Sequence, residues 1–454
     1  MQKKFIFILI LSFLVFAASG HGDNVRITIT SHEGWVLPLL GVNTGPVFLQ
    51  KNGDLFDATN SYKNAGVKQI RIHDFYGFLD MATLYPDQDA DPSNPSSYDF
   101  KKSDEVFMSI IKGGFEPYLR IGDSWHSAPG FPEPKRRAPI NRKNWVLAAV
   151  EVVRHYKKIA GENLKYVEIW NEPDHRQFWD APQYQFNVLF DETVKAIKKE
   201  FPDLKVGGPG FSAAVVLIPK GKMIVTSFLN YLKEHNTPVD FISWHLYSND
   251  PAVFAEIARF YRKELDRHGF YKTESHLTEY NTDTKMIPAG LSTVDLRLGS
   301  PAAAILTGAW IAMQNEKVDA AFFYRGLDPS MEEPLFYGLF RADGTMKKSA
   351  VCFSFWAQMA GCRKLKINLD EKKQSLWAIA GEDSSGNILL LISNPTGKDI
   401  EYTVNLENSG ISSLIIKEIN NTADKAIIRT VSGQQAYIPE FAVQMVKINR
   451  KLNF

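Results

Sequence analysis

The chain has 454 residues, of which 44% are hydrophobic and 23% are charged, and this composition is typical of a folded globular protein. The 52 Lys and Arg residues balance the 51 Asp and Glu residues, so no strong field exists that would attract nucleic acid or an anionic membrane. The two cysteines, Cys352 and Cys362, are too few for a disulfide scaffold, and no His and Cys spacing resembles a zinc site. Whether the two thiols pair stays open at this point.

Residues 1–20 have the pattern of a secretory signal peptide. Lys3 and Lys4 precede an apolar run from Phe5 to Ala18, which small residues follow as a cleavage pattern. The apolar run is too short to cross a bilayer comfortably. We therefore expect a secreted or periplasmic protein without membrane insertion.

Between residues 37 and 361, short β-branched or aromatic runs alternate with amphipathic stretches of helical spacing. The eight strand-like runs are Leu39 to Thr44, Gln69 to His73, Phe115 to Ile121, Tyr166 to Trp170, Lys205 to Gly208, Phe241 to Tyr247, His276 to Tyr280 and Ala320 to Tyr324. Strands that alternate with helices pair in parallel, and eight such units predict an α/β fold with a closed (β/α)₈ TIM barrel. An open doubly wound sheet is the alternative, and the lack of a glycine-rich phosphate loop after the first run weakens it.

The run Phe241 to Tyr247 favours a closed barrel. Its residues alternate between an apolar set and a set of hydrogen-bonding groups that includes His245 and Tyr247. In a barrel the polar set points inward near the strand ends, and the apolar set meets the surrounding helices.

After residue 361 the pattern changes to strand-like runs separated by turn segments, with no helical stretches between them. Residues 362–454 therefore predict a small accessory antiparallel β-sandwich domain. Residues 21–36 contain a further run, Val25 to Thr30, which precedes the first barrel strand. We expect this N-terminal strand to join the β domain.

Two glutamates stand at the carboxyl ends of predicted barrel strands, where barrel enzymes carry their reacting groups. Asn171 and Glu172 follow the fourth run, and Glu279 lies in the seventh. A single glutamate at a strand end is more often a solvated or salt-bridged residue than a catalyst. Two that face one pocket are what glycosidic cleavage needs, because one protonates the leaving oxygen and the other attacks the anomeric carbon or activates water.

Other polar and aromatic side chains are placed to contact a sugar. We expect hydrogen bonds or charge contacts from Arg71, His73, His245 and Tyr247. The expected stacking faces are those of Trp170 and Trp179, and we expect Trp125 to bind the substrate as well. No His-x-x-x-His pattern or carboxylate cluster accompanies the histidines, so we expect neither a metal nor another cofactor.

Four segments together resemble glycoside hydrolase family 39, which belongs to the (β/α)₈ glycosidase clan with paired glutamates and includes β-xylosidases and α-L-iduronidases. The segments are EIWNEPDHRQFW (168–179), KVGGP (205–209), DFISWHLY (240–247) and LTEYN (277–281). The resemblance spans the barrel, residues 37–361, and continues weakly into the β domain.

The resemblance implies roles for individual residues. Glu172 matches the general acid/base and Glu279 the nucleophile of a retaining mechanism. Arg71 and Tyr247 match positions that hold the nucleophile. Two further residues match sugar-binding positions of the pocket: Asn171, the ligand of the sugar 2-hydroxyl, and His245 on the sixth strand.

The resemblance leaves the substrate open. The segment NEPDH (171–175) is closer to iduronidases, whereas HLTEYN (276–281) is closer to β-xylosidases. Arg325, after the eighth strand, either clamps a substrate carboxylate or pairs with Asp328, and we favour the pairing and a neutral pocket. We therefore expect a β-xylosidase-like enzyme for plant or host polysaccharide fragments. We favour exo action, which a pocket closed around one sugar would give, whereas an open groove would give endo action.

Two alternatives remain at this stage. One is an α-L-iduronidase-like uronidase or another family 39 glycosidase. The other, of a different class, is an inactive carbohydrate-binding protein on the same scaffold, although a binding module has no need for paired acids. The sequence does not indicate the oligomeric state.

Overall fold

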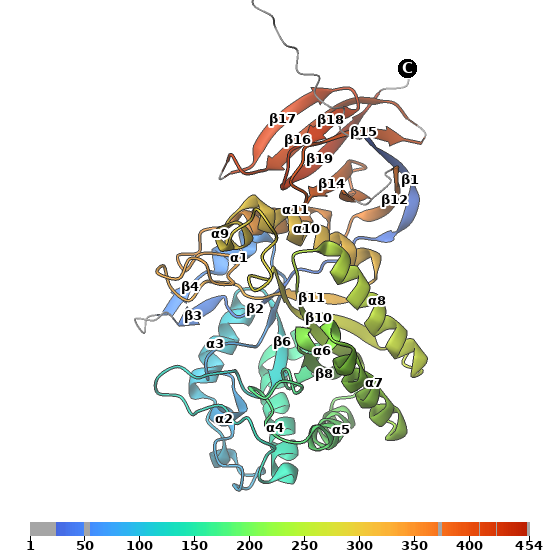
Figure 1. The fold of residues 1–454 in the computed structure, drawn as a ribbon. Coiled ribbons are helices and arrows are strands. Elements are labelled where there is room, and N and C mark those ends of the chain that lie inside the picture. The colour runs from blue at the N-terminus through green and yellow to red at the C-terminus, as the bar shows by residue number, and fades with distance from the viewer. Residues whose placement is uncertain (1–23, 50–54, 371–374, 408, 424, 452–454) are drawn as a thin grey trace, which may run out of the picture.

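The computed structural model describes residues 24–49, 55–370, 375–407, 409–423 and 425–451. The predicted signal peptide, residues 1–20, lies outside the described residues. Figure 1 shows two parts, a barrel surrounded by helices and a β domain packed against one side of it. No helix among the described residues is long and apolar enough to cross a membrane.

Eight parallel strands form the closed barrel in the described chain, in the order β10-β11-β2-β5-β6-β7-β8-β9. Their bounds are β2 (Gly41–Asn43), β5 (Gln69–Arg71), β6 (Glu116–Ile121), β7 (Tyr166–Ile169), β8 (Lys205–Phe211), β9 (Phe241–Tyr247), β10 (Glu274–Asn281) and β11 (Ala320–Phe323). Each corresponds to one of the eight runs predicted from the sequence. The TIM barrel is confirmed, and the open doubly wound sheet is excluded because β11 pairs with β2 and closes the ring.

Helices cover the outside of the barrel (Figure 1). Their bounds are α1 (Thr59–Ala65), α2 (Met81–Leu84), α3 (Lys101–Lys112), α4 (Arg142–Ala160), α5 (Gln183–Glu200), α6 (Ala213–Leu217), α7 (Pro219–Glu234), α8 (Pro251–Arg267), α9 (Thr293–Arg297), α10 (Ser300–Asn315) and α11 (Lys348–Met359). Helix α4 illustrates how the sequence specifies them. The Asn141 side chain accepts a hydrogen bond from the Asn144 backbone N–H and caps the helix, and a buried face of Val146, Ala149 and Val153 packs on the barrel.

The accessory domain contains one nine-stranded sheet within the described residues, in the order β17-β16-β19-β14-β13-β12-β1-β15-β18. Its bounds are β1 (Val25–Trp35), β12 (Arg363–Asp370), β13 (Trp377–Glu382), β14 (Ile388–Asn394), β15 (Ile400–Leu406), β16 (Ile411–Ile419), β17 (Ile427–Ser432), β18 (Gln435–Ile438) and β19 (Ala442–Arg450). The N-terminal strand β1 pairs antiparallel with β12 and parallel with β15, so the two ends of the chain share this domain (Figure 1).

The nine-stranded sheet folds over its own hydrophobic core. Strands β17 and β18 stand at opposite ends of the strand order, yet Arg429 on β17 donates a hydrogen bond of 2.9 Å to the backbone carbonyl of Tyr437 on β18. Buried aliphatic residues such as Ile27, Leu390 and Val446 fill the space between the two halves. A separate hairpin, β3 (Val47–Leu49) with β4 (Leu55–Asp57), lies beside the barrel.

Helix α10 connects the two parts. Its residues Ser300 to Gln314 are buried on all sides, because it packs between barrel helices α8 and α11 and the strands β13, β14 and β19. A helix that is apolar all round is expected where no side faces water. The buried α10 therefore fixes the β domain against the barrel.

Both cysteines are buried free thiols, so the possibility of a disulfide between them is not realised. Cys352 lies on α11, and burial raises the pKa of its thiol well above the ordinary value. Both side chains serve as small hydrophobic groups of the core.

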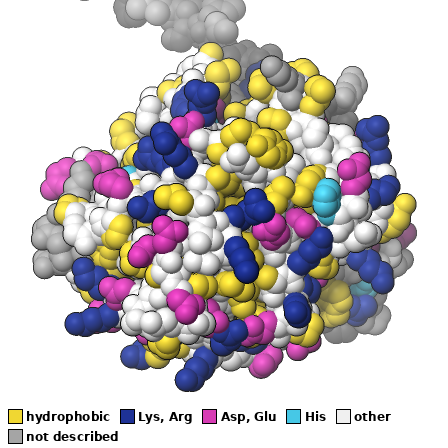
Figure 2. Space-filling view, turned by 90° about the horizontal axis from the view of Figure 1, so that it is seen from below, with side chains coloured by type: hydrophobic (Ala, Val, Ile, Leu, Met, Phe, Trp, Pro, Cys, Tyr) yellow, Lys and Arg dark blue, Asp and Glu magenta, His cyan; other side chains and the backbone are white. Residues whose placement is uncertain are grey.

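The interior of the barrel is plugged by aromatic side chains toward the amino ends of the strands. Tyr118, Phe241 and Phe322 form this buried cluster, and the Tyr118 hydroxyl lies 2.9 Å from Nδ1 of His276. These side chains fill the amino end of the barrel, so a pocket can form only at the carboxyl ends of the strands. The outer face seen in Figure 2 carries Lys and Arg side chains interspersed with Asp and Glu.

Candidate active site

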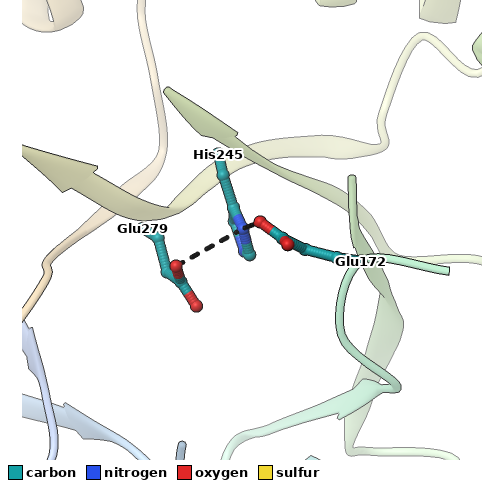
Figure 3. A group of neighbouring side chains, drawn as sticks. All are labelled: Glu172, His245 and Glu279. Atoms are coloured by element: carbon teal, nitrogen blue, oxygen red, sulfur yellow. Dashed lines mark hydrogen bonds and ion pairs between the residues drawn. The ribbon is translucent and has the colours of Figure 1, made fainter. Parts of the chain in front are cut away.

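Glu172 and Glu279 face one another at the carboxyl end of the barrel. Glu279 lies in β10, where it stands in register with His245 of β9, whereas Glu172 follows β7 with a positive φ of 45°. The backbone N–H of Glu172 donates to the carbonyl of Gly210, 2.9 Å away, which fixes this turn to strand β8. A carboxylate oxygen of each glutamate lies within 4.8 Å of the other and of a His245 ring nitrogen (Figure 3).

Glu279 is held by several hydrogen-bonding and charged partners. Its Oε1 accepts a hydrogen bond of 2.9 Å from Arg71 and lies 3.2 Å from Nε2 of His73. Its Oε2 accepts a hydrogen bond of 3.0 Å from the Tyr247 hydroxyl. Burial raises the pKa of Glu279, and the neighbouring Arg71 opposes that rise. The carboxylate is thus fixed in position and its negative charge is partly compensated.

Arg71 organises the floor of the site. Its Nε donates to Glu168 at 2.6 Å, and its two terminal nitrogens also donate to the side-chain carbonyls of Asn43 and Asn171 at 2.9 and 2.7 Å. The guanidinium is fully buried, and its pKa lies above the ordinary value because the carboxylates of Glu168 and Glu279 outweigh the cost of burial. Arg71 thus compensates two buried carboxylates, which would be left as unpaired charges without it.

Glu168 is a site residue that the sequence reasoning missed. Its Oε1 accepts a hydrogen bond of 2.6 Å from Ser243, and its side chain is fully buried. A charged residue in the middle of a buried strand requires a partner, because an unpaired buried charge is strongly destabilising. That signal was present in the sequence, four residues before Glu172.

Glu172 has fewer partners than Glu279. Its Oε1 lies 2.7 Å from Nδ1 of His245, and 17% of its side chain remains exposed to the pocket. Burial, with repulsion from Asp174, raises the pKa of Glu172 to about 8. Burial also lowers the pKa of His245 to about 4, so that imidazole is neutral near pH 7. A carboxyl group with this pKa holds a proton at neutral pH.

A cavity of about 510 Å³ opens above the two glutamates. It is lined by residues from the loops after several barrel strands: His73, Trp125, Glu172, His175, Gln177, Phe178, Ser212, Ala213, Ala214, Leu217, Tyr247, Glu279, Thr282, Asp283, Lys285, Tyr324 and Tyr337. A volume of this size is typical of a small-molecule site. The predicted pocket residues His73, Trp125 and Tyr247 lie on its surface.

Comparison with known proteins agrees with this geometry. The family model described as glycosyl hydrolases family 39 matches residues 41–261, which include strands β2 to β9 and Glu172. This part of the chain, which forms most of the barrel, therefore has the sequence of glycoside hydrolase family 39.

Two similar proteins are β-xylosidases. That of Geobacillus stearothermophilus is 26% identical over 247 residues, which cover 48% of this chain and 47% of the relative. That of Caldicellulosiruptor saccharolyticus is 22% identical over 374 residues, which cover 72% of this chain and 69% of the relative. The chain thus spans about half the length of the first relative.

Solved structures share the fold over nearly the whole chain. A glucosidase from Croceicoccus marinus superposes with a TM-score of 0.74 at 23% identity and covers 94% of this chain and 100% of its own. A monomeric β-xylosidase from Caulobacter crescentus gives a TM-score of 0.70 at 17% identity, with coverages of 93% and 99%. The barrel with its accessory β domain is therefore an architecture seen in other solved structures.

Trp170 and Trp179 do not offer stacking faces to the pocket, contrary to the sequence prediction. They are 4% and 3% exposed and pack edge to face with ring centroids 5.1 Å apart. Trp145 and Phe186 complete this aromatic cluster. The loop after β7 turns these rings into the core, so Trp125 is the one of the three predicted tryptophans that lines the cavity.

Both interpretations of Arg325 are wrong. The side chain is fully buried outside the cavity lining, where its guanidinium lies 4.8 Å from the Phe48 ring and hydrogen-bonds with the Tyr76 hydroxyl. Asp328 pairs instead with Lys347, at 2.7 Å. Residues three apart share a face in a helix, but this segment is not helical, so Arg325 and Asp328 do not meet.

The side chain of Asn171 contacts Arg71 in the floor of the site. Its side-chain carbonyl accepts from Arg71, while its Nδ2 is buried without a protein partner among the described residues. Asn171 is 2% exposed and is not among the residues that line the cavity. It therefore lies in the floor beneath the cavity lining rather than on the cavity surface.

The sequence reasoning did not identify the loop residues Phe178, Leu217, Lys285, Tyr324 and Tyr337 as pocket residues. They lie far apart in the chain and converge only because each follows the carboxyl end of a barrel strand. Tyr324 hydrogen-bonds with Asp74, which places its ring beside the cavity.

Glu172, His245 and Glu279 are also the described residues whose spacing would suit a metal ion. The 2.7 Å contact between His245 and Glu172 argues against that use, because two ligands bonded at ~2 Å to one tetrahedral ion lie ~3.3 Å apart. The pair shares a hydrogen bond, and the three groups are better suited to acid–base chemistry.

Proposed function

We propose that this chain is a retaining glycoside hydrolase with β-xylosidase-like, exo-acting activity. The observation that carries the proposal is the approach of a carboxylate oxygen of Glu172 to within 4.8 Å of one of Glu279. Retaining glycosidases have their carboxyl groups ~5 to 5.5 Å apart, whereas inverting enzymes need ~6.5 to 9.5 Å to admit a water molecule. The observed approach supports direct attack by a carboxylate.

In the first step Glu279 acts as the nucleophile and Glu172 as the general acid. An Oε atom of Glu279 attacks the anomeric carbon, the glycosidic C–O bond breaks, and the leaving oxygen takes the proton of Glu172. The pKa of about 8 keeps that proton on Glu172 in the free enzyme. A neutral His245 that donates from Nδ1 to Oε1 leaves Oε2 of Glu172 to carry the proton.

In the second step a water molecule replaces the departed aglycone. Glu172, now ionised, removes a proton from this water, which attacks the anomeric carbon of the glycosyl ester and releases Glu279 as a carboxylate. Arg71 and Tyr247 hold the two oxygens of Glu279 in both steps through the contacts of 2.9 and 3.0 Å. Two displacements at the same carbon return its configuration.

Two observations support an uncharged sugar, rather than a uronate, as the substrate. Arg325 lies outside the cavity lining, so the planar clamp that would recognise a uronate carboxylate does not reach the site. The two similar proteins described above are β-xylosidases. The Trp125 face would contact the sugar ring. We also propose export of the protein, on the basis of the signal-peptide pattern of residues 1–20.

A screen of aryl glycosides tests the proposal. The set contains the 4-nitrophenyl β-D-xyloside, α-L-arabinoside and β-D-glucoside and an aryl α-L-iduronide. We expect the highest kcat/KM on the β-xyloside, with β-xylose as the first product seen by proton NMR. α-Xylose as the first product would contradict the retaining mechanism, and activity confined to the iduronide would contradict the neutral pocket. Turnover of none would favour a carbohydrate-binding role.

A further inference from the structure

One wall of the active-site cavity is aliphatic and faces solvent. Ala213, Ala214 and Leu217 of the short helix α6 line the cavity, and Leu217 is 54% exposed. The next residue, Ile218, is also 54% exposed. Exposed aliphatic residues at the mouth of a polar site indicate a binding surface, because contact with an apolar ligand group removes them from water.

The aliphatic wall stands on the side of the general acid. The carboxylate of Asp174, two residues after Glu172, accepts hydrogen bonds from the backbone N–H and the hydroxyl of Ser212, which directly precedes α6. The loop of the acid and the aliphatic wall are thus joined. Because Glu172 protonates the leaving oxygen, the group attached to that oxygen must lie on this side.

The loop after β10 also carries exposed apolar residues beside the cavity. Lys285 lines the cavity, and the two residues that follow it, Met286 and Ile287, are 74% and 39% exposed. The Asn249 side chain donates hydrogen bonds of 2.7 and 2.8 Å to the carbonyls of Asp283 and Met286, which holds this loop at the pocket.

The half of the cavity around Glu279 is different in character. His73, Tyr247 and Tyr324 line it with hydrogen-bonding groups, as a sugar ring requires. A cavity of about 510 Å³ accommodates a ligand larger than one pentose, so part of the aglycone lies inside it as well. On the side of Glu172 the lining also contains the polar His175, Gln177 and Ser212. The exposed part of this wall, Leu217 with the two alanines, offers an aglycone neither a hydrogen bond nor a flat ring.

We infer that the enzyme prefers glycosides with a nonpolar aglycone, such as an alkyl or fused hydrocarbon-ring alcohol, over the next sugar of a polysaccharide. The inference rests on the proposed glycosidase function and deepens it by naming the leaving-group class. The ring of Phe178 and the side chains of α6 would enclose the hydrocarbon, while the sugar occupies the polar half.

Methyl and hexyl β-D-xylopyranoside, used with the full chain, test the inference. Their leaving alcohols have similar acidity, so a difference in kcat/KM reports contact with the aglycone. Burial of each methylene is worth roughly fourfold, and we expect kcat/KM for the hexyl glycoside to exceed that for the methyl glycoside by ~10-fold or more. Xylobiose should be hydrolysed less efficiently than the hexyl glycoside.

Two variants of the wall locate the contact. Leu217→Ser should reduce the hexyl-to-methyl ratio at least ~3-fold, and Ala214→Asp should reduce it further because a carboxylate disfavours a hydrocarbon neighbour. Ile428→Ser is the matched control, since Ile428 is 64% exposed on β17 of the β domain, and the ratio should stay unchanged.

The outcomes separate the inference from the proposed function. Equal kcat/KM for the two alkyl glycosides, or a clear preference for xylobiose, would overturn the nonpolar aglycone and leave the glycosidase assignment standing. An unchanged ratio in both wall variants would equally overturn the role of α6. Failure to hydrolyse either alkyl glycoside or the 4-nitrophenyl xyloside would overturn both.

Discussion

Glu279 and Glu172 have the same side chain but different surroundings. Glu279 contacts Arg71, His73 and Tyr247 and is 6% exposed, whereas Glu172 contacts a neutral His245 and is 17% exposed. Burial raises the pKa of both groups, but Arg71 opposes the rise at Glu279, whereas Asp174 adds to the rise at Glu172, whose pKa reaches about 8. The comparison shows how a barrel assigns different chemistry to two identical groups through the partners that neighbouring strands supply.

Loss of the nucleophile should have the largest effect. We expect Glu279→Ala to lower kcat/KM by at least ~10⁴-fold on every glycoside, because no other group can form the covalent intermediate. Steady-state assays with 4-nitrophenyl and 2,4-dinitrophenyl β-xyloside measure it. Substantial activity of the variant on either substrate would show that Glu279 is not the nucleophile.

Loss of the acid should be selective. Glu172→Ala should reduce activity on alkyl xylosides by ~10² to 10⁴-fold but spare 2,4-dinitrophenyl xyloside in the first step, since that leaving group needs no proton. Added azide should restore turnover and yield β-xylosyl azide, because a small anion can replace water without a general base. Equal losses of activity on all substrates, with no effect of azide, would contradict the assignment of Glu172 as the general acid/base.

Arg71 should determine stability as well as activity. Arg71→Met leaves Glu168 and Glu279 buried without their cation, a change that typically costs ~3 to 5 kcal/mol of unfolding free energy. Arg154→Met, which breaks exposed ion pairs with Glu151 and Glu200, should cost less than ~1 kcal/mol. Denaturant unfolding of the two variants measures the difference, and similar losses would contradict an anchoring role for Arg71.

The pH dependence should report the proton of Glu172. The acid must be protonated, so kcat/KM for methyl xyloside should fall as pH rises through about 8, the raised pKa of this group. The same alkaline limb should be absent from the first step with 2,4-dinitrophenyl xyloside. If kcat/KM for the methyl glycoside already falls with rising pH below pH 6, the pKa of Glu172 is not raised to about 8.

Strand-level features of the fold were predictable from the sequence. Alternating runs gave the eight barrel strands, and their ends placed Glu172 and Glu279 together because all strands of a parallel barrel end at one face. The strand Val25–Trp35 was also recognisable as separate from the barrel, but its pairing with β15 depends on strand order, which no local pattern encodes.

Side-chain directions in the loops were not predictable. Trp179 and Arg325 both follow strand ends, yet the first turns into an aromatic cluster and the second is buried between Phe48 and Tyr76. Whether such a residue points into the pocket depends on the path of its whole loop and on partners distant in sequence. By contrast, the contact of Arg71 with Glu279 was anticipated through the family resemblance, which carries tertiary information that composition and spacing lack.

Covalent trapping of the sugar tests the division of roles most directly. The enzyme is incubated with 2,4-dinitrophenyl 2-deoxy-2-fluoro-β-D-xyloside, whose fluorine slows breakdown of the glycosyl ester, and then digested for peptide mass spectrometry. The account predicts one equivalent of fluoroxylosyl group on Glu279 and release of one equivalent of dinitrophenol. A label on Glu172, or no label from an enzyme that hydrolyses the parent 2,4-dinitrophenyl xyloside, would contradict it.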